Sequence, residues 1–171
     1  TCNRRLHLLD LIPIFSYVAL KGKCRGCGQK ISSVYPFIEF VTGALFAFSY
    51  IRLGFSLELI IALLFVSLLV IITVSDLAYM IIPDKVLLPF AIALLILRWI
   101  IPTSPWWDSL LGAAVGFCVL YVIAVVSKGG MGGGDIKLFF VIGLVLGTVN
   151  TLLTLFLASL IGSVVGIYVL K

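Results

Sequence analysis

GGMGGGDIK, residues 129–137, gathers five glycines ahead of an aspartate and a lysine, and long apolar runs lie on both sides of it. A carboxylate beside a hydrocarbon-length helix is costly, and within a span such a group marks a functional site by default. The glycines permit backbone conformations that other residues avoid and allow a second backbone to come close. We therefore interpret Asp135 as a candidate functional residue at the point where a glycine-rich loop enters a membrane helix.

The composition of the 171-residue chain is that of an integral membrane protein. Hydrophobic residues make up 63% of it and charged residues 11%, with a mean hydropathy of +1.30. A transmembrane helix needs about 20 predominantly apolar residues, and helices satisfy their own backbone polar groups in lipid. The sequence predicts an all-α, polytopic membrane protein with about six transmembrane helices, at residues 36–53, 57–75, 85–101, 109–127, 136–149 and 151–170.

The basic residues indicate orientation rather than a nucleic-acid partner. Although the net charge is +5, six of the twelve Lys and Arg residues lie in the first 30 positions and the others lie singly at helix ends. Lys and Arg concentrate on the cytoplasmic side of membrane proteins. With the N-terminal segment in the cytoplasm, ten of the twelve share that side and only Arg52 and Arg98 do not. The loops 75–85 and 128–137 then both face the cytoplasm.

Residues 1–35 are predicted to form a small, cytosolic zinc-knuckle domain, and residues 36–171 the transmembrane domain. Cys24 and Cys27 form a CxxC pair, a spacing that lets two thiolates bind one tetrahedral zinc ion, and Cys2 is a third candidate ligand. Cytosolic thiols stay reduced, which favours zinc over a disulfide. The alternatives are a redox pair or a chance surface pair. Because a four-cysteine site needs a further ligand, expected before Cys2, we expect this domain to be truncated.

Asp76 and Asp135 are the candidate catalytic pair. Two carboxylates hydrolyse a peptide when they share a proton, so that one activates a water and the other donates to the carbonyl oxygen. Each aspartate alone is also explained as a helix-terminal residue, favourable through the helix dipole or as a cap. Together, beside the glycines, they favour function. Since the span 136–149 would measure only about 21 Å, we expect Asp135 to lie below the membrane surface in a water-accessible cavity.

Several nearby residues are predicted to support this pair. Gly132 and Gly134 would leave room for an extended peptide, and Lys137 follows closely. Asp84 comes after a proline just before an apolar run, ordinary helix-start chemistry, so we interpret it as orienting or structural. Glu39 is interpreted as an interfacial acid, with a role near the cytoplasmic site as the alternative. Two further acids at outer helix starts, Glu58 and Asp108, are explained by the helix dipole.

Four segments, in this order and spacing, resemble the motifs of type IV prepilin peptidases, most closely those of competence-type members of Gram-positive bacteria. They are DLIPIFSYVALKGKCRGCGQKIS (10–32), YPFIEFVTG (35–43), SDLAYMIIPD (75–84) and GGMGGGDIKLF (129–139). The resemblance implies an aspartic endopeptidase of the bacterial cell membrane. Such an enzyme removes the basic leader of prepilins or pseudopilins after a glycine, on the cytoplasmic side. Many members then methylate the new N-terminus with S-adenosylmethionine.

The resemblance also implies roles for particular residues. Asp76 and Asp135 become the catalytic pair, and Gly22 is associated with methyl transfer. Apart from the resemblance, Glu39 is a further candidate cofactor-binding residue. The zinc ligands would be Cys2, Cys24 and Cys27. Family members usually have an earlier CxxC pair with its own hydrophobic segment and a proline-rich segment with a last span. Of these, this chain contains only Cys2, which looks like the second cysteine of the earlier pair. Methyl transfer rests on the resemblance alone, because no glycine-rich fingerprint for the methyl donor is present.

Two other classes of protein fit part of the pattern. A small transporter or channel subunit could bind a cation with helix-end aspartates and use glycines to break a helix. It would not need the cysteine-containing head, and its acids would lie near the midplane rather than at one face. A structural scaffold of a pilus assembly machine is the second alternative, and it predicts no turnover.

Overall fold

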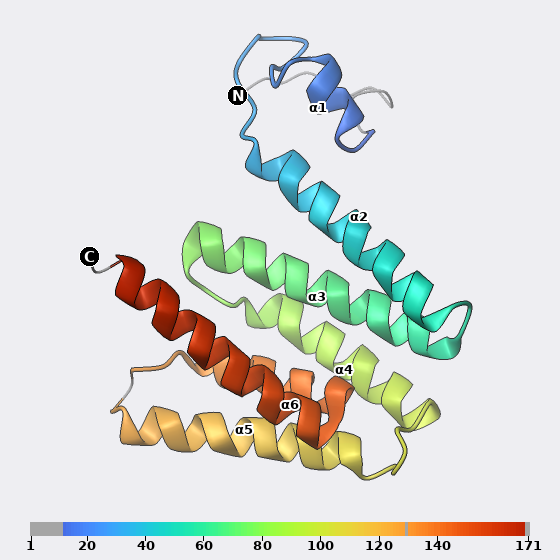
Figure 1. Cartoon of the computed structure of the whole chain (residues 1–171), viewed down its shortest axis with the longest axis vertical. Helices are drawn as coiled ribbons and strands as arrows, with labels where there is room; N and C mark the ends of the chain where they lie inside the picture. Colours follow the sequence, from blue (N-terminus) through green and yellow to red (C-terminus); the bar gives the residue numbers. More distant parts are fainter. Residues whose placement is uncertain (1–11, 129, 170–171) are drawn as a thin grey trace. The chain divides into compact units, whose positions relative to one another are not determined.

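The computed structural model describes residues 12–128 and 130–169, and these form six α-helices with no β-strand. The all-α prediction is thereby confirmed. The helices are divided between two compact units, residues 1–55 and 56–171, which are described separately. In chain order (Figure 1), they are α1 (Phe15–Ala19), α2 (Val34–Leu53), α3 (Leu57–Tyr79), α4 (Asp84–Ile100), α5 (Asp108–Val126) and α6 (Gly133–Val169).

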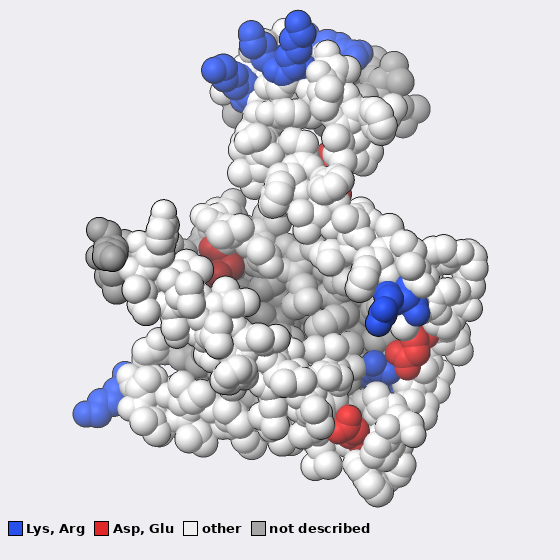
Figure 2. Space-filling model, in the orientation of Figure 1, with Lys and Arg blue, Asp and Glu red and all other residues white. Residues whose placement is uncertain are grey.

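The first unit joins a short hairpin and α1 to the long apolar helix α2. An isolated antiparallel bridge pairs Lys23 with Lys30 and closes the loop that contains the CxxC motif. The backbone N–H of Ile14, just before α1, donates to Glu39 Oε2 on α2 at 2.9 Å. Figure 2 shows Lys and Arg side chains gathered on the part of this unit that contains α1. The charge segregation expected from the sequence is therefore present within the unit.

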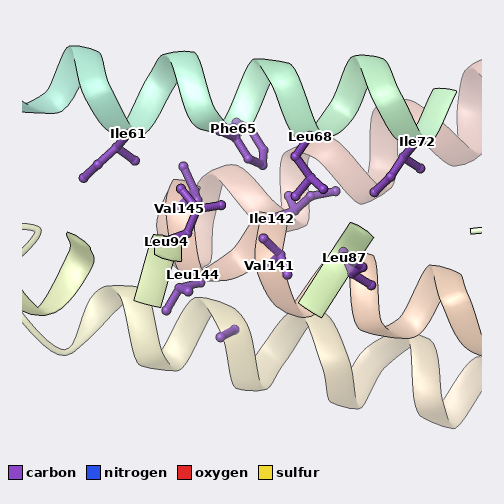
Figure 3. Packing of buried hydrophobic residues seen from close by; sticks show 11 residues of the cluster. Ile61, Phe65, Leu68, Ile72, Leu87, Leu94, Val141, Ile142, Leu144 and Val145 are labelled. Atoms are coloured by element: carbon purple, nitrogen blue, oxygen red, sulfur yellow. The ribbon is translucent and has the colours of Figure 1, made fainter. Parts of the chain in front are cut away.

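The second unit packs α3 to α6 around one apolar core (Figure 3). Its α3 residues, Ile61, Phe65, Leu68 and Ile72, recur at spacings of four and three, which places them on one face of the helix. The opposite faces are also apolar, as in a helix surrounded by hydrocarbon. The other buried hydrophobic side chains of this core are Leu87, Leu94, Ala113, Val141, Ile142, Leu144 and Val145.

Four of the described helices are long and apolar enough to cross a membrane: Val34–Leu53, Leu57–Tyr79, Asp108–Val126 and Gly133–Tyr168. The fold is therefore that of a multi-pass helical membrane protein. The fourth predicted span corresponds to α5. The third corresponds to α4, which has 17 residues and carries Pro89 and Arg98 within it. The number of six transmembrane helices stays a prediction.

Helix α6 contains both the fifth and the sixth predicted spans, joined at a break. Gly147 has φ 76° and ψ 179°, which is not helical, and the chain reverses there so that the two halves run in opposite directions (Figure 1). The predicted spans, 136–149 and 151–170, put the separation at residue 150. The bend lies at Gly147 instead, because only glycine adopts this backbone conformation readily. We call residues 133–146 the leading half-helix and residues 148–169 the trailing half-helix.

Helices α5 and α6 cross at backbone contact distance. A Cβ atom added at Gly112 would lie 2.5 Å from the Gly143 carbonyl oxygen, and one added at Gly116 would lie 2.6 Å from the Phe139 oxygen. Gly112 and Gly116 on α5 are four residues apart, as are Gly143 and Gly147 on α6. Small residues at this spacing let membrane helices approach closely. The crossing fixes the leading half-helix against α5.

The alternating helices give the second unit two ends. At one end, which we call the site end, lie the end of α3, the start of α4, the end of α5 and the start of α6 (Figure 1). At the other, the break end, lie the start of α3, the end of α4 and the start of α5, and Gly147 lies there against Asp108, the first residue of α5. The loops 75–85 and 128–137 therefore share one end of the unit, as the charge count predicted.

Candidate carboxylate site

Asp76 lies in the last turns of α3, which continues to Tyr79. The helix is closed by Met80, whose backbone has φ 52° and whose N–H donates to the Asp76 carbonyl oxygen at 2.8 Å. The hydroxyl of Ser75 donates to the Ile81 carbonyl oxygen at 2.9 Å. These bonds fold the α3–α4 loop back over the helix end, and the Asp76 residue is left exposed.

Asp135 lies in the first turn of α6, which begins at Gly133, earlier than the predicted start at residue 136. Its backbone N–H donates to the Gly132 carbonyl oxygen at 3.2 Å. Its carboxylate folds back over the same residue, because a Cβ atom at Gly132 would lie 3.3 Å from Asp135 Oδ2. Asp135 is partly buried, so its surroundings differ from those of the exposed Asp76.

The structure brings the two predicted catalytic aspartates together. They are 59 residues apart in sequence and come from different helices, yet the negative charge of Asp76 acts on the Asp135 carboxylate. Two carboxylates that influence each other electrostatically, one more shielded from solvent than the other, are the arrangement in which acid and base roles can separate. Their catalytic roles and the predicted water-accessible cavity stay predictions.

Gly134 explains how the two loops come so close. A Cβ atom at this position would lie 2.8 Å from Ile82 Cβ, so the first turn of α6 packs directly on the α3–α4 loop that follows Asp76. The glycine makes room for a side chain of the same chain. Gly133 differs, since nothing lies within 4 Å of its Cβ position. Clearance for a substrate backbone, predicted for Gly132 and Gly134, is better matched by the open side at Gly133.

An ion pair joins two of the predicted supporting residues. Lys137 Nζ donates to Asp84 Oδ2 at 2.7 Å, and each side chain is about half exposed. Asp84 lies in the first turn of α4 and Lys137 in the first turns of α6. The pair thus links the two helix starts at the site end, which is consistent with the orienting role predicted for Asp84.

Cys24 and Cys27 lie in the tight loop closed by the Lys23–Lys30 bridge. The Cys24 N–H donates to the Gln29 oxygen at 2.8 Å, and the Gly28 N–H donates to the Cys24 oxygen at 2.9 Å. Gly28 has φ 70°, the left-handed conformation that completes the turn. Cys2, the third predicted ligand, lies outside the described residues. Within residues 12–128 and 130–169, His, Cys, Asp and Glu side chains form no group of three suited to a metal ion.

The structure gives Gly22 and Glu39 intramolecular contacts. Gly22 has φ 68°, and a Cβ atom there would lie 2.9 Å from the Tyr17 hydroxyl oxygen. Its carbonyl oxygen accepts from the Ile31 N–H at 2.8 Å. Glu39 accepts the Ile14 backbone N–H described above. The methyl-transfer and cofactor roles of both residues stay predictions.

Sequence reasoning missed a polar cluster at the break end, where the helix dipole alone was invoked for Glu58 and Asp108. Arg98 Nη1 donates to both Glu58 oxygens at 2.8 and 3.0 Å, and Asp108 accepts a backbone N–H from α6. Two features of the sequence could have indicated this cluster. Arg98 lies inside an apolar run, and Gly143 and Gly147 lie four residues apart in a later apolar run. The three charged side chains lie on three helices, so the sequence alone did not connect them.

A helical, multi-pass membrane protein with a carboxylate pair at one end is the class that this fold and site define. Two family models match the chain. The model described as the type IV leader peptidase family matches residues 63–167, and the bacterial peptidase A24 N-terminal domain matches residues 1–53. The chain therefore belongs to the type IV leader peptidase family, as the four motifs predicted.

Curated relatives agree with this assignment. The prepilin leader peptidase/N-methyltransferase of Bacillus subtilis (strain 168) is 49% identical over 96% of this chain and 66% of its own length. The proteins of the same name from Myxococcus xanthus (strain DK1622) and Neisseria gonorrhoeae are 37% and 36% identical, over 52% and 60% of their lengths. The chain thus spans about half to two thirds of these relatives. No solved structure matches it.

Proposed function

We propose that this chain carries the peptidase site of a membrane aspartic endopeptidase that removes the leader peptide of type IV prepilins or competence pseudopilins. The observation that carries the proposal is that Asp76 and Asp135 lie at the same end of the unit, where the first turn of α6 packs on the α3–α4 loop through Gly134 and Ile82, and where the charge of Asp76 acts on the Asp135 carboxylate. The family assignment and the names of the relatives support the substrate class. They do not support a transporter or channel subunit, in which the acids would be expected near the midplane.

The two carboxylates divide the chemistry between them. One, ionised, takes a proton from a water molecule as the water oxygen attacks the scissile carbonyl carbon. The other, protonated, donates its proton to the carbonyl oxygen, which gives a neutral tetrahedral diol. The C–N bond then breaks as the proton held by the first carboxylate passes to the leaving nitrogen, and the second carboxylate takes back the hydroxyl proton. The pair ends with one proton, as it began.

Neighbouring residues hold this geometry. The packing of Gly134 on Ile82 sets the distance between the α3–α4 loop and the first turn of α6. The Lys137–Asp84 ion pair links that turn to α4. Gly133, with open space at its Cβ position, lies one residue beyond Gly132, whose Cβ position borders the Asp135 carboxylate. An extended substrate segment would approach on this open side.

The site end is assigned to the cytoplasmic face of a bacterial cell membrane. The support is the distribution of Lys and Arg, ten of which fall on that side in the predicted topology, together with the rule that basic residues remain cytoplasmic. The leader would be cut there while the following apolar part of the substrate stays in the lipid.

Two further activities of the head are part of the proposal. Methylation of the new N-terminus with S-adenosylmethionine rests on the names of the relatives and on the sequence motifs, with Gly22 and Glu39 as candidate residues. Zinc binding rests on the donor set: Cys24 and Cys27 share one tight loop, as half of a tetrahedral thiolate site requires. Cys2 would be a third ligand, and zinc bound there would stabilise the head.

The test is cleavage of a synthetic prepilin leader peptide by the purified membrane protein. We expect Asp76→Asn and Asp135→Asn each to abolish cleavage while expression and folding are retained. Asp84→Asn is the matched comparison, an exposed acid at the same end, and it should lower activity only a few-fold, far short of abolishing it. Cleavage retained in both aspartate-pair variants would refute the mechanism, and absence of turnover in the unsubstituted protein would favour the scaffold alternative.

A further inference from the structure

The break at Gly147 creates a problem that a membrane helix must solve. At φ 76° and ψ 179° the helical hydrogen-bond ladder is interrupted, so carbonyls at the end of the leading half-helix and N–H groups at the start of the trailing half-helix lose their partners. In a water-poor interior, each backbone group without a hydrogen-bond partner is strongly destabilising. Some other part of the chain therefore has to supply partners there.

Charged side chains from neighbouring helices supply them. Asp108 Oδ1, at the start of α5, accepts the Thr148 N–H at 3.1 Å. Arg98 Nη2, near the end of α4, donates to the Val145 carbonyl oxygen at 2.7 Å. The Arg98 side chain is only 9% exposed, and its charge is balanced by Glu58 on α3. We call Glu58, Arg98 and Asp108 the break-end cluster.

Gly147 fits this cluster as no other residue would. A Cβ atom there would collide with the Asp108 carboxylate, and the Gly147 carbonyl oxygen accepts the buried Thr151 hydroxyl at 2.6 Å. The helix can therefore break at only one residue, and hydrogen bonds hold the backbone on both sides of that residue. A shift of α6 by one residue would separate Asp108 and Arg98 from their backbone partners and place a side chain against Asp108.

The leading half-helix connects the break to the carboxylate site. It has Gly147 at one end and Asp135 in its first turn, and its 14 residues measure about 21 Å. Its backbone contacts α5 at Gly143 and near Phe139, so it behaves as a rigid rod held against a rigid neighbour. Any axial displacement at the break end is therefore transmitted to Asp135 at the site end.

We infer that Arg98 and Asp108 are positioning residues of the peptidase site, which fix the axial position of the leading half-helix and hence the placement of Asp135 relative to Asp76. This inference rests on the proposed function. The two residues act through the helix and touch no substrate. Reaction rates are sensitive to such placement, because a displacement of about 1 Å can cost about 10²-fold.

The first experiment measures steady-state cleavage of the leader peptide. We expect Asp108→Ala to lower kcat by at least about tenfold with KM little changed, because the catalytic geometry is altered while the substrate-binding surface is not. Asp108→Asn keeps an oxygen acceptor for the Thr148 N–H and should retain most of kcat. Arg98→Lys keeps a charge for Glu58 but loses the second donor to Val145, so an intermediate kcat is expected. Thr154→Ala, which removes a hydroxyl bond within the trailing half-helix, is the matched control.

A second experiment reports position without activity. The Cβ position of residue 134 lies 2.8 Å from Ile82 Cβ, closer than the roughly 3.5–4.5 Å that a disulfide spans. The pair Ile82→Cys and Gly134→Cys, with Cys118→Ala to lower background, should therefore form a disulfide after the two loops part slightly, at a rate that depends on their spacing. Adding Asp108→Ala should change that rate several-fold, whereas adding Thr154→Ala should not. The protein without the introduced pair gives the background rate.

The outcomes separate the two proposals. Unchanged kcat and unchanged cross-linking in Asp108→Ala would overturn the positioning role even if the aspartate pair is essential. Cleavage retained in Asp76→Asn and Asp135→Asn would refute the proposed mechanism, while the cross-linking result would still decide the mechanical link. If Asp108→Ala fails to fold, Arg98→Lys and Asp108→Asn decide: equal kcat and equal cross-linking in Arg98→Lys, Asp108→Asn and the unsubstituted protein would overturn the inference.

Discussion

Lys137 Nζ lies 2.7 Å from Asp84 Oδ2, and this ion pair joins the first turns of α6 to the start of α4 beside the carboxylate site. Both side chains are about half exposed, so solvent screens the interaction, and pairs of this kind contribute below about 1 kcal/mol. The value of the pair lies in orientation more than in stability.

Breaking this pair should therefore affect activity mildly and stability hardly at all. We expect Lys137→Ala and Asp84→Ala each to lower kcat a few-fold, and the double variant to lower it no further, because either change removes the same contact. Cleavage assays on the three variants form a double-mutant cycle. Fully additive losses would show that the two residues act independently of their contact.

The glycines before Asp135 are expected to differ sharply in tolerance. Gly134→Ala would push a methyl group against Ile82 Cβ, 2.8 Å away, and should reduce kcat at least about tenfold by moving the α3–α4 loop. Ile82→Gly in the same chain removes the opposing atom and should restore part of the activity. A Gly134→Ala enzyme with normal kcat would show that the close packing is unnecessary.

Gly133→Ala serves as the matched change on the open side. Nothing lies within 4 Å of its Cβ position, and alanine favours a helical backbone over glycine by up to about 1 kcal/mol. We expect thermal stability to be unchanged or slightly higher and KM for the leader peptide to rise, because the methyl group would occupy space used by the substrate. An unchanged KM would place the substrate elsewhere.

Much of this arrangement could be predicted from local sequence. Long apolar runs placed the helices, and the Lys and Arg distribution placed the loops of Asp76 and Asp135 at one end. Local sequence did not show which residues form hydrogen bonds or ion pairs across helices. Asp108 was explained by the dipole of the helix that it begins, although it accepts a hydrogen bond from the Thr148 N–H, 40 residues later. The boundary between the last two spans was predicted at residue 150, whereas the backbone of Gly147 and its contact with Asp108 decide where the helix breaks. Such pairings depend on the packing of helices, which hydropathy does not encode.

The crossing of α5 and α6 should be the most sensitive point for stability. Gly112→Ala would bring a methyl group within 2.5 Å of the Gly143 carbonyl oxygen, and backbone atoms at a helix crossing cannot move aside. Overpacking of this kind costs about 1–3 kcal/mol. Gly162→Ala, on the partner helix α6, is the control, since nothing lies within 4 Å of its Cβ position. Thermal unfolding in one detergent should show a lower midpoint for Gly112→Ala alone, and equal midpoints would mean that the helices can separate without loss.

The CxxC loop should bind zinc in the protein as it folds in the cell. We expect elemental analysis to find about one zinc ion per chain, and Cys24→Ser or Cys27→Ser to lower that ratio and the stability of the first unit, because metal and folding are coupled. Cys118→Ser is the control, since Cys118 belongs to α5 in the other unit. Peptide cleavage by the metal-depleted protein then separates two roles. If cleavage is retained after zinc is removed, zinc stabilises the first unit but is not needed for catalysis. A folded, active protein that never contains zinc would refute the metal site.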